Sequence, residues 1–211
     1  MLDHLVYAVL DVEAACDDLE QRLGVRPTLG GRFAQMAAFN HILSLGGGAY
    51  VEVIGPDPDA DPPTQPRPFG LDGLTAPRLT TWAAKDTDLE AKVEAARAAG
   101  YDMGQALPLS RELPDGTTLA WTLTVRMAQP GPEGGLVPFL IDWGRVSEDG
   151  KHPSDTGAQG CQLVEFHGEH PDPEMVLKSL EAVGQPINVK KAERPGMVAT
   201  IQGPNGQIEL R

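Results

Sequence analysis

The feature that most constrains the fold is a short α+β unit that recurs along the chain. In each copy an apolar strand is followed by an amphipathic helix that stops at a glycine. The strand and the terminal glycine of the successive copies are 3–9 with Gly24, 79–84 with Gly100, and 162–166 with Gly184. Because such a unit buries its apolar face only against a neighbour, repetition predicts that the copies pack together.

The helices are marked by apolar residues at helical spacing and by polar residues at their ends. In the first helix Val12, Cys16 and Leu19 fall on one stripe. Each helix begins at an aspartate whose carboxylate can accept from unpaired backbone N–H groups: Asp11, Asp86 or Asp88, and Asp172. The terminal glycine supplies the left-handed backbone that closes each helix.

After each helix the pattern changes to the alternation that is typical of strands. Segments 39–45 and 49–54 flank a run of glycines and predict a hairpin. Segment 117–127 alternates between an apolar and a polar face, as a sheet covered on one side does. Segments 138–143, 197–201 and 207–210 complete the strands. We therefore expect an α+β fold built from repeated βαβββ modules with curved mixed sheets.

The module boundaries follow from this pattern and from two polar segments that interrupt it. We expect a first module at 1–56, a Pro/Asp-rich connector at 57–78, a second module at 79–144, a linker at 145–160 and a third, shorter module at 161–211. The prolines predict a stiff, solvated connector. The linker either joins the second and third modules or folds over a site.

Composition agrees with a compact protein. At 211 residues and 41% hydrophobic content the chain can bury a core. The net charge of −13 argues against nucleic acid or an anionic membrane as a partner. No segment is long enough to span a membrane and no signal peptide precedes His4, so we expect a cytoplasmic protein. The two cysteines do not form a disulfide framework, and Cys16 is expected to be a buried thiol.

Several segments resemble the vicinal oxygen chelate superfamily, and within it the glyoxalase-like branch. They are Asp3–Val9, Asn40–Gly46, Tyr50–Pro56, Pro138–Gly144 and Pro204–Leu210. The resemblance implies that paired βαβββ modules curl their sheets into a cup open to solvent. It also implies that a divalent metal in the cup acts as a Lewis acid on a substrate chelated through two neighbouring oxygens.

The resemblance places His4 and Glu52 at metal-ligand positions of the first and last strands of the first module. An imidazole and a carboxylate on adjacent strands suit a divalent metal, and we take Glu52 also as the catalytic residue. Aligning the first two helices places Thr81 at the position equivalent to His4, so the second module lacks that histidine. Asp142 is the candidate for a third metal ligand.

Five side chains are candidates for contact with the substrate. Asn40 and Ser44 lie on one face of their strand, whereas His41 lies on the other and is expected to be structural. Arg111 would clamp a carboxylate or phosphate. Trp121 would wall the pocket, although core packing is expected for most of the tryptophans. His152 is either a lid residue or solvated.

Two classes of function remain open. The first is a metal-dependent isomerase or lyase acting on a small oxygenated metabolite, with nickel, zinc, manganese or iron as the ion. A ring-cleaving dioxygenase ranks lower, because such enzymes bring two histidines to iron. The second class is a metal-free small-molecule binding or resistance protein, which the missing histidine at Thr81 favours. The third module is expected to pack within the chain or across a homodimer interface.

Overall fold

A computed structural model describes residues 1–112, 118–126, 133–144 and 152–211, with the side chains of 111 and 112 outside the description. Four α-helices lie in these ranges: α1 (Val12–Leu23), α2 (Leu89–Ala98), α3 (Pro153–Thr156) and α4 (Pro173–Val183). Two 3-10 segments are η1 (Ala34–Met36) and η2 (Pro68–Gly73). The strands are β1 (Leu2–Ala8), β2 (Thr28–Phe33), β3 (Ala38–Ser44), β4 (Tyr50–Pro56), β5 (Arg78–Lys85), β6 (Gln105–Glu112), β7 (Thr118–Val125), β8 (Phe139–Asp142), β9 (Gln162–His170), β10 (Val189–Lys191), β11 (Gly196–Gly203) and β12 (Gly206–Leu210).

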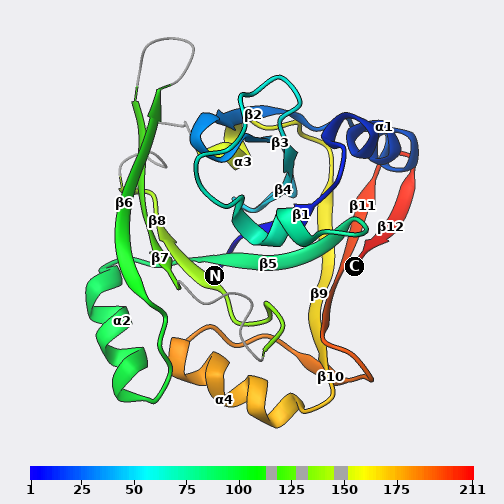
Figure 1. The fold of residues 1–211 in the computed structure, drawn as a ribbon. Helices are drawn as coiled ribbons and strands as arrows, with labels where there is room; N and C mark the ends of the chain where they lie inside the picture. The colour runs from blue at the N-terminus through cyan, green and yellow to red at the C-terminus, as the bar shows by residue number, and fades with distance from the viewer. Residues whose placement is uncertain (113–117, 127–132, 145–151) are drawn as a thin grey trace.

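The main sheet has eight strands in the order β2-β3-β4-β1-β5-β8-β7-β6. Strands β1 and β4 pair in parallel, as do β5 and β8, while the remaining neighbours are antiparallel. This mixed sheet curls into a half-barrel cup (Figure 1), which confirms the fold class expected from the sequence. Its two halves meet where β1 lies beside β5.

The register between β1 and β5 is symmetric. His4 pairs with Ala83, and Thr81 pairs with Val6. A two-fold operation that exchanges the two strands therefore exchanges His4 with Thr81 and Val6 with Ala83. The alignment made from the helices alone is confirmed by this register, because it also equates His4 with Thr81.

The largest core lies on the face of the sheet that carries the helices. Leu5 of β1 and Val9, which follows this strand, pack there with the apolar stripe of α1 and with Leu89 and Val93 of α2. Helix α1 begins as expected, since the Asp11 side chain accepts from the backbone N–H of Ala14. It ends at Gly24, whose φ of 82° is the left-handed conformation that glycine adopts without strain.

The start of α2 differs from the other helix starts. Asp88 occupies the N-cap position with a φ of 53° and makes no side-chain capping bond. The carboxylate of Asp86 instead accepts from the N–H of Thr87 and pairs with Lys92. In α4 the expected cap is present, because the Asp172 side chain accepts from the N–H of Met175.

The last part of the chain forms a separate four-stranded sheet with the order β10-β9-β11-β12. Here the first strand of the unit lies between its second and third strands, unlike in the main sheet. Its apolar residues, among them Met197 and Ile201, join the core on the helix side of the main sheet. The turn after β11 contacts α1, where the N–H of Asn205 donates to the carbonyl of Leu23.

The connector covers part of the concave face of the main sheet, and the linker pairs with β3 at the edge of that sheet. From the connector, Leu71 and Leu74 are buried against Val6, Ala8 and Ile54. Figure 1 shows the short η2 helix inside the curve of the sheet, next to β5. From the linker, the backbone of Ala158 bonds to β3 at Ile42 and Ser44. The connector and the linker thus both contribute to the environment of the concave face.

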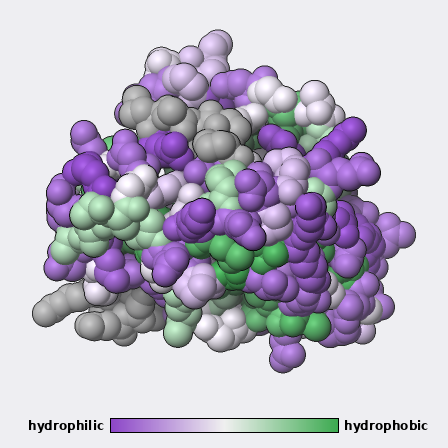
Figure 2. Space-filling view, turned by 90° about the horizontal axis from the view of Figure 1, so that it is seen from below, coloured by the Kyte–Doolittle hydropathy of each residue, from purple (hydrophilic) through white to green (hydrophobic). Residues whose placement is uncertain are grey.

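The surface is dominated by polar residues. Figure 2 shows a face that is hydrophilic over most of its area, with smaller hydrophobic areas between. Leu177 of α4 is one exposed apolar side chain, at 42%. No helix in the described part of the chain is long and apolar enough to cross a membrane.

Candidate functional site

A histidine and a carboxylate converge on the concave face, close to the junction between the two halves of the sheet. The Nε2 atom of His4 lies 3.8 Å from Oε2 of Glu52. The two residues come from adjacent parallel strands, in a register that pairs His4 with Tyr50 and Val6 with Glu52. Both are buried, with 4% and 7% of their surface exposed. The structure therefore brings together the two residues that sequence reasoning placed at ligand positions.

The other ring nitrogen of His4 is bound by its neighbour in the sequence. Nδ1 of His4 lies 2.6 Å from Oδ1 of Asp3. Asp3 is fully buried. Burial opposes ionisation of this carboxyl, but hydrogen bonds from His152 and His4 outweigh burial and hold the pKa of Asp3 well below its usual range. Asp3 is therefore a buried anion that orients the imidazole, a role that sequence reasoning did not give it.

Glu52 has a second polar neighbour on β3. The Nδ2 atom of Asn40 donates to Oε1 of Glu52. The Oδ1 atom of the same amide is buried and has no hydrogen-bond partner among the described residues. It lies against Gly30, where a Cβ atom would come within 2.5 Å of it. Asn40 thus stabilises the Glu52 carboxylate, and Gly30 leaves room for the amide.

Aromatic rings enclose the pair. The ring of Tyr50 stacks on His4 with the centroids 4.7 Å apart, and Phe139 forms a T-shaped contact with His4 at 5.5 Å. Trp143 and Trp121 continue this wall, with centroids 5.5 Å apart. The site therefore combines one imidazole and one carboxylate with a largely apolar surround.

The half of the sheet that contains β5 and β8 supplies different residues at the equivalent positions. Ala83 pairs with Phe139 as Val6 pairs with Glu52, so Phe139 is the counterpart of Glu52. Thr81 is the counterpart of His4. Neither threonine nor phenylalanine here offers the imidazole or carboxylate of the first half. The polar pair of the site comes from one half of the sheet alone.

Asp142 is not brought to this pair. Along β8, Ile141 and Trp143 pack on the concave face, whereas Leu140 packs in the core on the helix side. Strand alternation places Asp142 on the same side as Leu140. Its Oδ1 atom accepts from the N–H of Gly144. The expectation that Asp142 is a third metal ligand is therefore not met. Its carboxylate could bind an ion, but it lies on the helix side of the sheet, away from His4 and Glu52.

His152 is buried, and it connects the start of α3 to Asp3 of β1. Its Nε2 atom lies 3.1 Å from Oδ2 of Asp3, and its Nδ1 atom accepts from the N–H of Ser154 at the start of α3. Only 2% of the residue is exposed, so His152 is not solvated. The sequence left open whether His152 is a lid residue or solvated. Its burial and its contacts with Asp3 and Ser154 argue against a solvated residue.

The remaining candidates are spread around the rim. Ser44 is buried beside Tyr50 on β4, and its hydroxyl accepts from the N–H of Gly46. Trp121 lies on β7 next to Trp143. The backbone of Arg111 pairs with Leu119, on the strand edge of the cup, but its side chain lies outside the described part of the structure. The anion clamp proposed for Arg111 therefore stays a prediction.

His41 has the structural role expected from its place on the opposite face of β3. Its Nδ1 atom lies 3.2 Å from the carbonyl of Pro27 and 3.4 Å from the sulfur of Cys16. Its Nε2 atom lies 3.3 Å from Oε1 of Glu13. Burial, followed by the Glu13 charge, raises the pKa of the Cys16 thiol to about 12. This cluster is a packed polar contact between α1 and the sheet, and its thiol is not activated.

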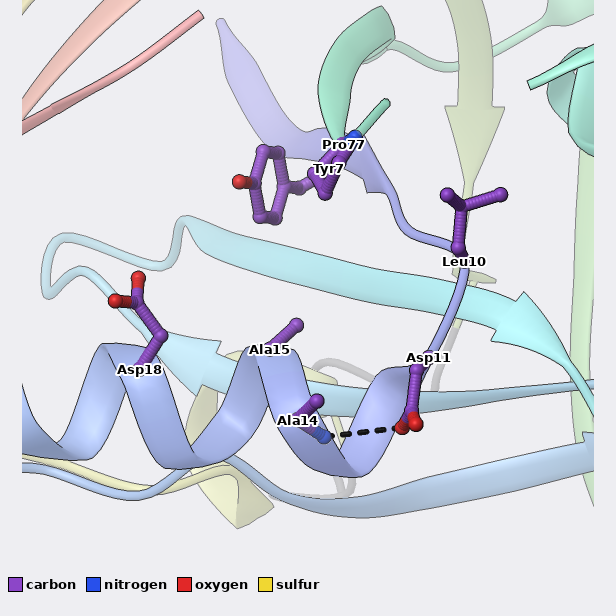
Figure 3. A pocket seen from close by; sticks show the side chains of 7 residues that line it. All are labelled: Tyr7, Leu10, Asp11, Ala14, Ala15, Asp18 and Pro77. Carbon is purple, nitrogen blue, oxygen red and sulfur yellow. Dashed lines mark hydrogen bonds between the residues drawn. The ribbon is translucent and has the colours of Figure 1, made fainter. Parts of the chain in front are cut away.

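A separate pocket of about 260 Å³ lies against α1, away from the His4–Glu52 pair. Figure 3 shows the ring of Tyr7 above the helix, with Asp11 engaged in capping the N–H of Ala14. Tyr7 alternates with His4 and Val6 along β1, so its side chain projects to the other face of the sheet. The lining residues are Tyr7, Leu10, Asp11, Ala14, Ala15, Asp18 and Pro77. The lining of this pocket includes carboxylates but no imidazole, so it does not reproduce the His4–Glu52 pair.

The donor set fits two ligand positions of a divalent metal. His4 offers Nε2 with its other nitrogen held by a carboxylate, the arrangement common to metal-binding histidines. Glu52 offers an oxygen beside it. Among the described residues no group of three or more His, Cys, Asp or Glu side chains could hold a metal ion. Further ligands would have to come from substrate or solvent.

Comparisons with known proteins identify the family. A family model described as a glyoxalase-like domain matches residues 2–184. No curated protein matches the chain. Among solved structures, a hypothetical protein from Staphylococcus aureus is similar with a TM-score of 0.65 and 13% identity, over 99% of this chain and 83% of that one.

Methylmalonyl-CoA epimerases are similar over a smaller part of the chain. The Mycobacterium tuberculosis enzyme has a TM-score of 0.45 and 18% identity, over 70% of this chain and 91% of that one. The Streptomyces coelicolor enzyme has a TM-score of 0.43 and 16% identity, over 67% and 92%. The family match covers most of the chain and agrees with the curled sheet, so the chain belongs to the glyoxalase-like domain family of the vicinal oxygen chelate superfamily.

Proposed function

We propose that the cup is the active site of a divalent-metal-dependent isomerase or lyase acting on a small metabolite with two neighbouring oxygens. The observation that carries this proposal is the convergence of His4 Nε2 and Glu52 Oε2 at 3.8 Å. Two electron-pair donors this close, both nearly closed off from solvent, suit a cation held between them. With only His4 and Glu52 as protein ligands, the remaining coordination positions of the ion would be open to the substrate.

Each residue has a defined part in this proposal. His4 binds through Nε2, and Asp3 holds its ring in place. Glu52 binds through Oε2 while Asn40 holds its other oxygen. When bound, the ion would act as a Lewis acid that stabilises an enolate-like oxyanion. The apolar wall of Phe139 and Trp143 would exclude water and accept the rest of the substrate.

A metal-free small-molecule binding protein is the second candidate. It is favoured by Thr81 and Phe139, which stand where the other half of the sheet carries His4 and Glu52. The hydrogen bond from Asn40 also satisfies part of the Glu52 carboxylate without an ion. In that function the cup would select its ligand by aromatic contact and by hydrogen bonds to Glu52.

Calorimetric titration of the metal-stripped protein with Mn²⁺, Fe²⁺, Ni²⁺ and Zn²⁺ separates the two. We expect one ion per chain for at least one metal, and a higher melting temperature in its presence because the ion binds the native state. Glu52→Gln keeps the shape of the side chain and its bond with Asn40, yet should abolish both effects. His4→Ala should do the same.

His41→Ala is the matched control, because His41 is a buried histidine on the other face of the sheet. It should lower the melting temperature of the metal-free protein and leave the affinity for the ion unchanged. Failure of all these metals to bind the wild-type protein would reject the metal-dependent enzyme and leave the binding protein as the better account.

A further inference from the structure

We propose that Asp3 is a positioning residue for this site: its carboxylate fixes His4 as the Nδ1–H tautomer, which directs the Nε2 lone pair at Glu52. The second oxygen of Asp3 holds His152 at the start of α3. The reason for positioning His4 in this way depends on the proposed function. The tautomer itself follows from the contacts of Asp3 and does not depend on that function.

The two oxygens of Asp3 have different partners. Oδ1 lies 2.6 Å from Nδ1 of His4. Oδ2 receives the indole N–H of Trp143 at 3.0 Å and lies 3.1 Å from Nε2 of His152. The ammonium of Lys85 stands 3.7 Å from the same oxygen. One carboxylate thus joins β1 to β5, to the end of β8 and to the start of α3.

These partners determine which nitrogen of His4 carries the proton. Oδ2 of the fully buried Asp3 faces two groups that can only donate, the indole N–H of Trp143 and the ammonium of Lys85, so this carboxylate accepts hydrogen bonds and donates none. Nδ1 of His4 must therefore be the donor in the short contact with Oδ1. In the neutral imidazole Nε2 then has a free electron pair, and this atom is the one that faces Glu52.

The same reasoning applies to His152 and gives it a different task. Its Nδ1 atom accepts from the N–H of Ser154, so the proton is on Nε2 and is donated to Asp3. Both nitrogens of His152 are therefore occupied by the protein. His152 holds α3 against β1 and turns Asp3 so that its other oxygen meets His4.

Long-range ¹H–¹⁵N correlation spectra of the metal-free wild-type protein test the tautomer directly. The His4 ring is identified as the imidazole signal that disappears in His4→Gln. At pH 8 we expect a protonated Nδ1 and an unprotonated Nε2. A protonated Nε2, whether in the other tautomer or in an imidazolium, would overturn the proposal. This arm needs no ion and no foldable variant of Asp3.

A second arm measures the consequence for ion binding. Asp3→Asn should raise the Kd for the ion that the wild-type protein binds best by roughly 10–100-fold, as loss of an outer carboxylate does at other metal histidines. It should also mix the tautomers of His4 in the spectra. Lys85→Met, which removes a partner of Oδ2 and leaves the His4 contact intact, should change the Kd by less than about threefold.

The outcomes separate the two proposals. An Nδ1–H tautomer in a protein that binds no ion would reject the metal-dependent function and keep the positioning role of Asp3. An unchanged Kd and an unchanged tautomer in Asp3→Asn would reject the positioning role and keep the function. Equal weakening by Asp3→Asn and Lys85→Met would reduce Asp3 to a structural anchor.

Discussion

Phe139 stands in β8 where Glu52 stands in β4, because each pairs with the counterpart residue of the neighbouring parallel strand. The rings of Phe139 and His4 pack in a T-shaped arrangement, with centroids 5.5 Å apart. One half of the sheet thus supplies the polar pair of the site, and the other half supplies an aromatic surface for it. The proposed substrate would lie between the two.

This asymmetry predicts that ion affinity rises when the half of the sheet with β5 and β8 is given the same two ligand types as the half with β1 and β4. The double variant Thr81→His, Phe139→Glu places an imidazole and a carboxylate at the positions equivalent to His4 and Glu52. We expect at least roughly tenfold tighter ion binding by calorimetry, since two more ligands reach the ion. The metal-free variant should be less stable than the wild type, because a buried carboxylate replaces an aromatic ring.

Asp142→Ala is the control for that variant. The Asp142 side chain lies on the helix side of β8 and binds the N–H of Gly144. Its removal should leave ion affinity within about threefold of the wild type, since it reaches neither His4 nor Glu52. Loss of ion binding in this variant would restore Asp142 as a ligand and contradict the face assigned to it.

Two glycines of β11 provide a test of how the last unit docks on α1. A Cβ atom at Gly203 would lie 2.4 Å from the carbonyl oxygen of Leu23, whereas one at Gly196 would meet nothing within 4 Å. Gly203→Ala should therefore lower the free energy of unfolding by about 1–3 kcal/mol through overpacking. Gly196→Ala should leave it unchanged or raise it by up to about 1 kcal/mol. Urea unfolding measures both, and equal effects would contradict this contact.

The Cys16 thiol predicts a loss of stability at alkaline pH. Its pKa is raised to about 12 in the folded chain by burial and by Glu13. An unfolded thiol ionises near pH 8.5, so above that pH the unfolded state binds fewer protons than the folded state. The free energy of unfolding should then fall by up to about 1.4 kcal/mol per pH unit. Cys16→Ala should have a flatter profile between pH 8.5 and pH 10, and parallel profiles would contradict this assignment.

The last unit should be required for a soluble fold. Met197, Ala199 and Ile201 share a core with α1 and the main sheet, so removal of residues 160–211 would expose that core. We expect the truncated chain to aggregate on expression. A soluble truncation that unfolds cooperatively would show that the main sheet folds without this unit.

Much of the fold was predictable because it depends on local patterns. The apolar stripe of α1, its Asp11 cap and its Gly24 end lie within one short segment. Helix α2 does start after Asp88, one of the two expected positions, but the capping bond expected there is missing because the Asp88 side chain makes none and Asp86 accepts from the N–H of Thr87 instead. The unusual order of the last sheet was not predictable, because strand order depends on contacts that the sequence pattern does not encode.

The sequence predicted the site residues correctly only where the alternation of side chains along a strand determines which face of the sheet they occupy. His4, Glu52 and Asn40 share the concave face through their strand positions, and they meet as expected. Asp142 was placed by residue type rather than by face. Asp3 was missed because its partners Trp143 and His152 are distant in sequence. An aspartate directly before a candidate ligand histidine was the available signal.

A crystal structure of the protein with bound Mn²⁺ or Ni²⁺, with the ion located by its anomalous scattering, tests the central claim most directly. We predict one ion between β1 and β4, ligated by Nε2 of His4 and by one oxygen of Glu52. The contact of His4 with Asp3 should be retained in that structure. An ion bound elsewhere, or none in the cup at saturating concentration, would contradict the account.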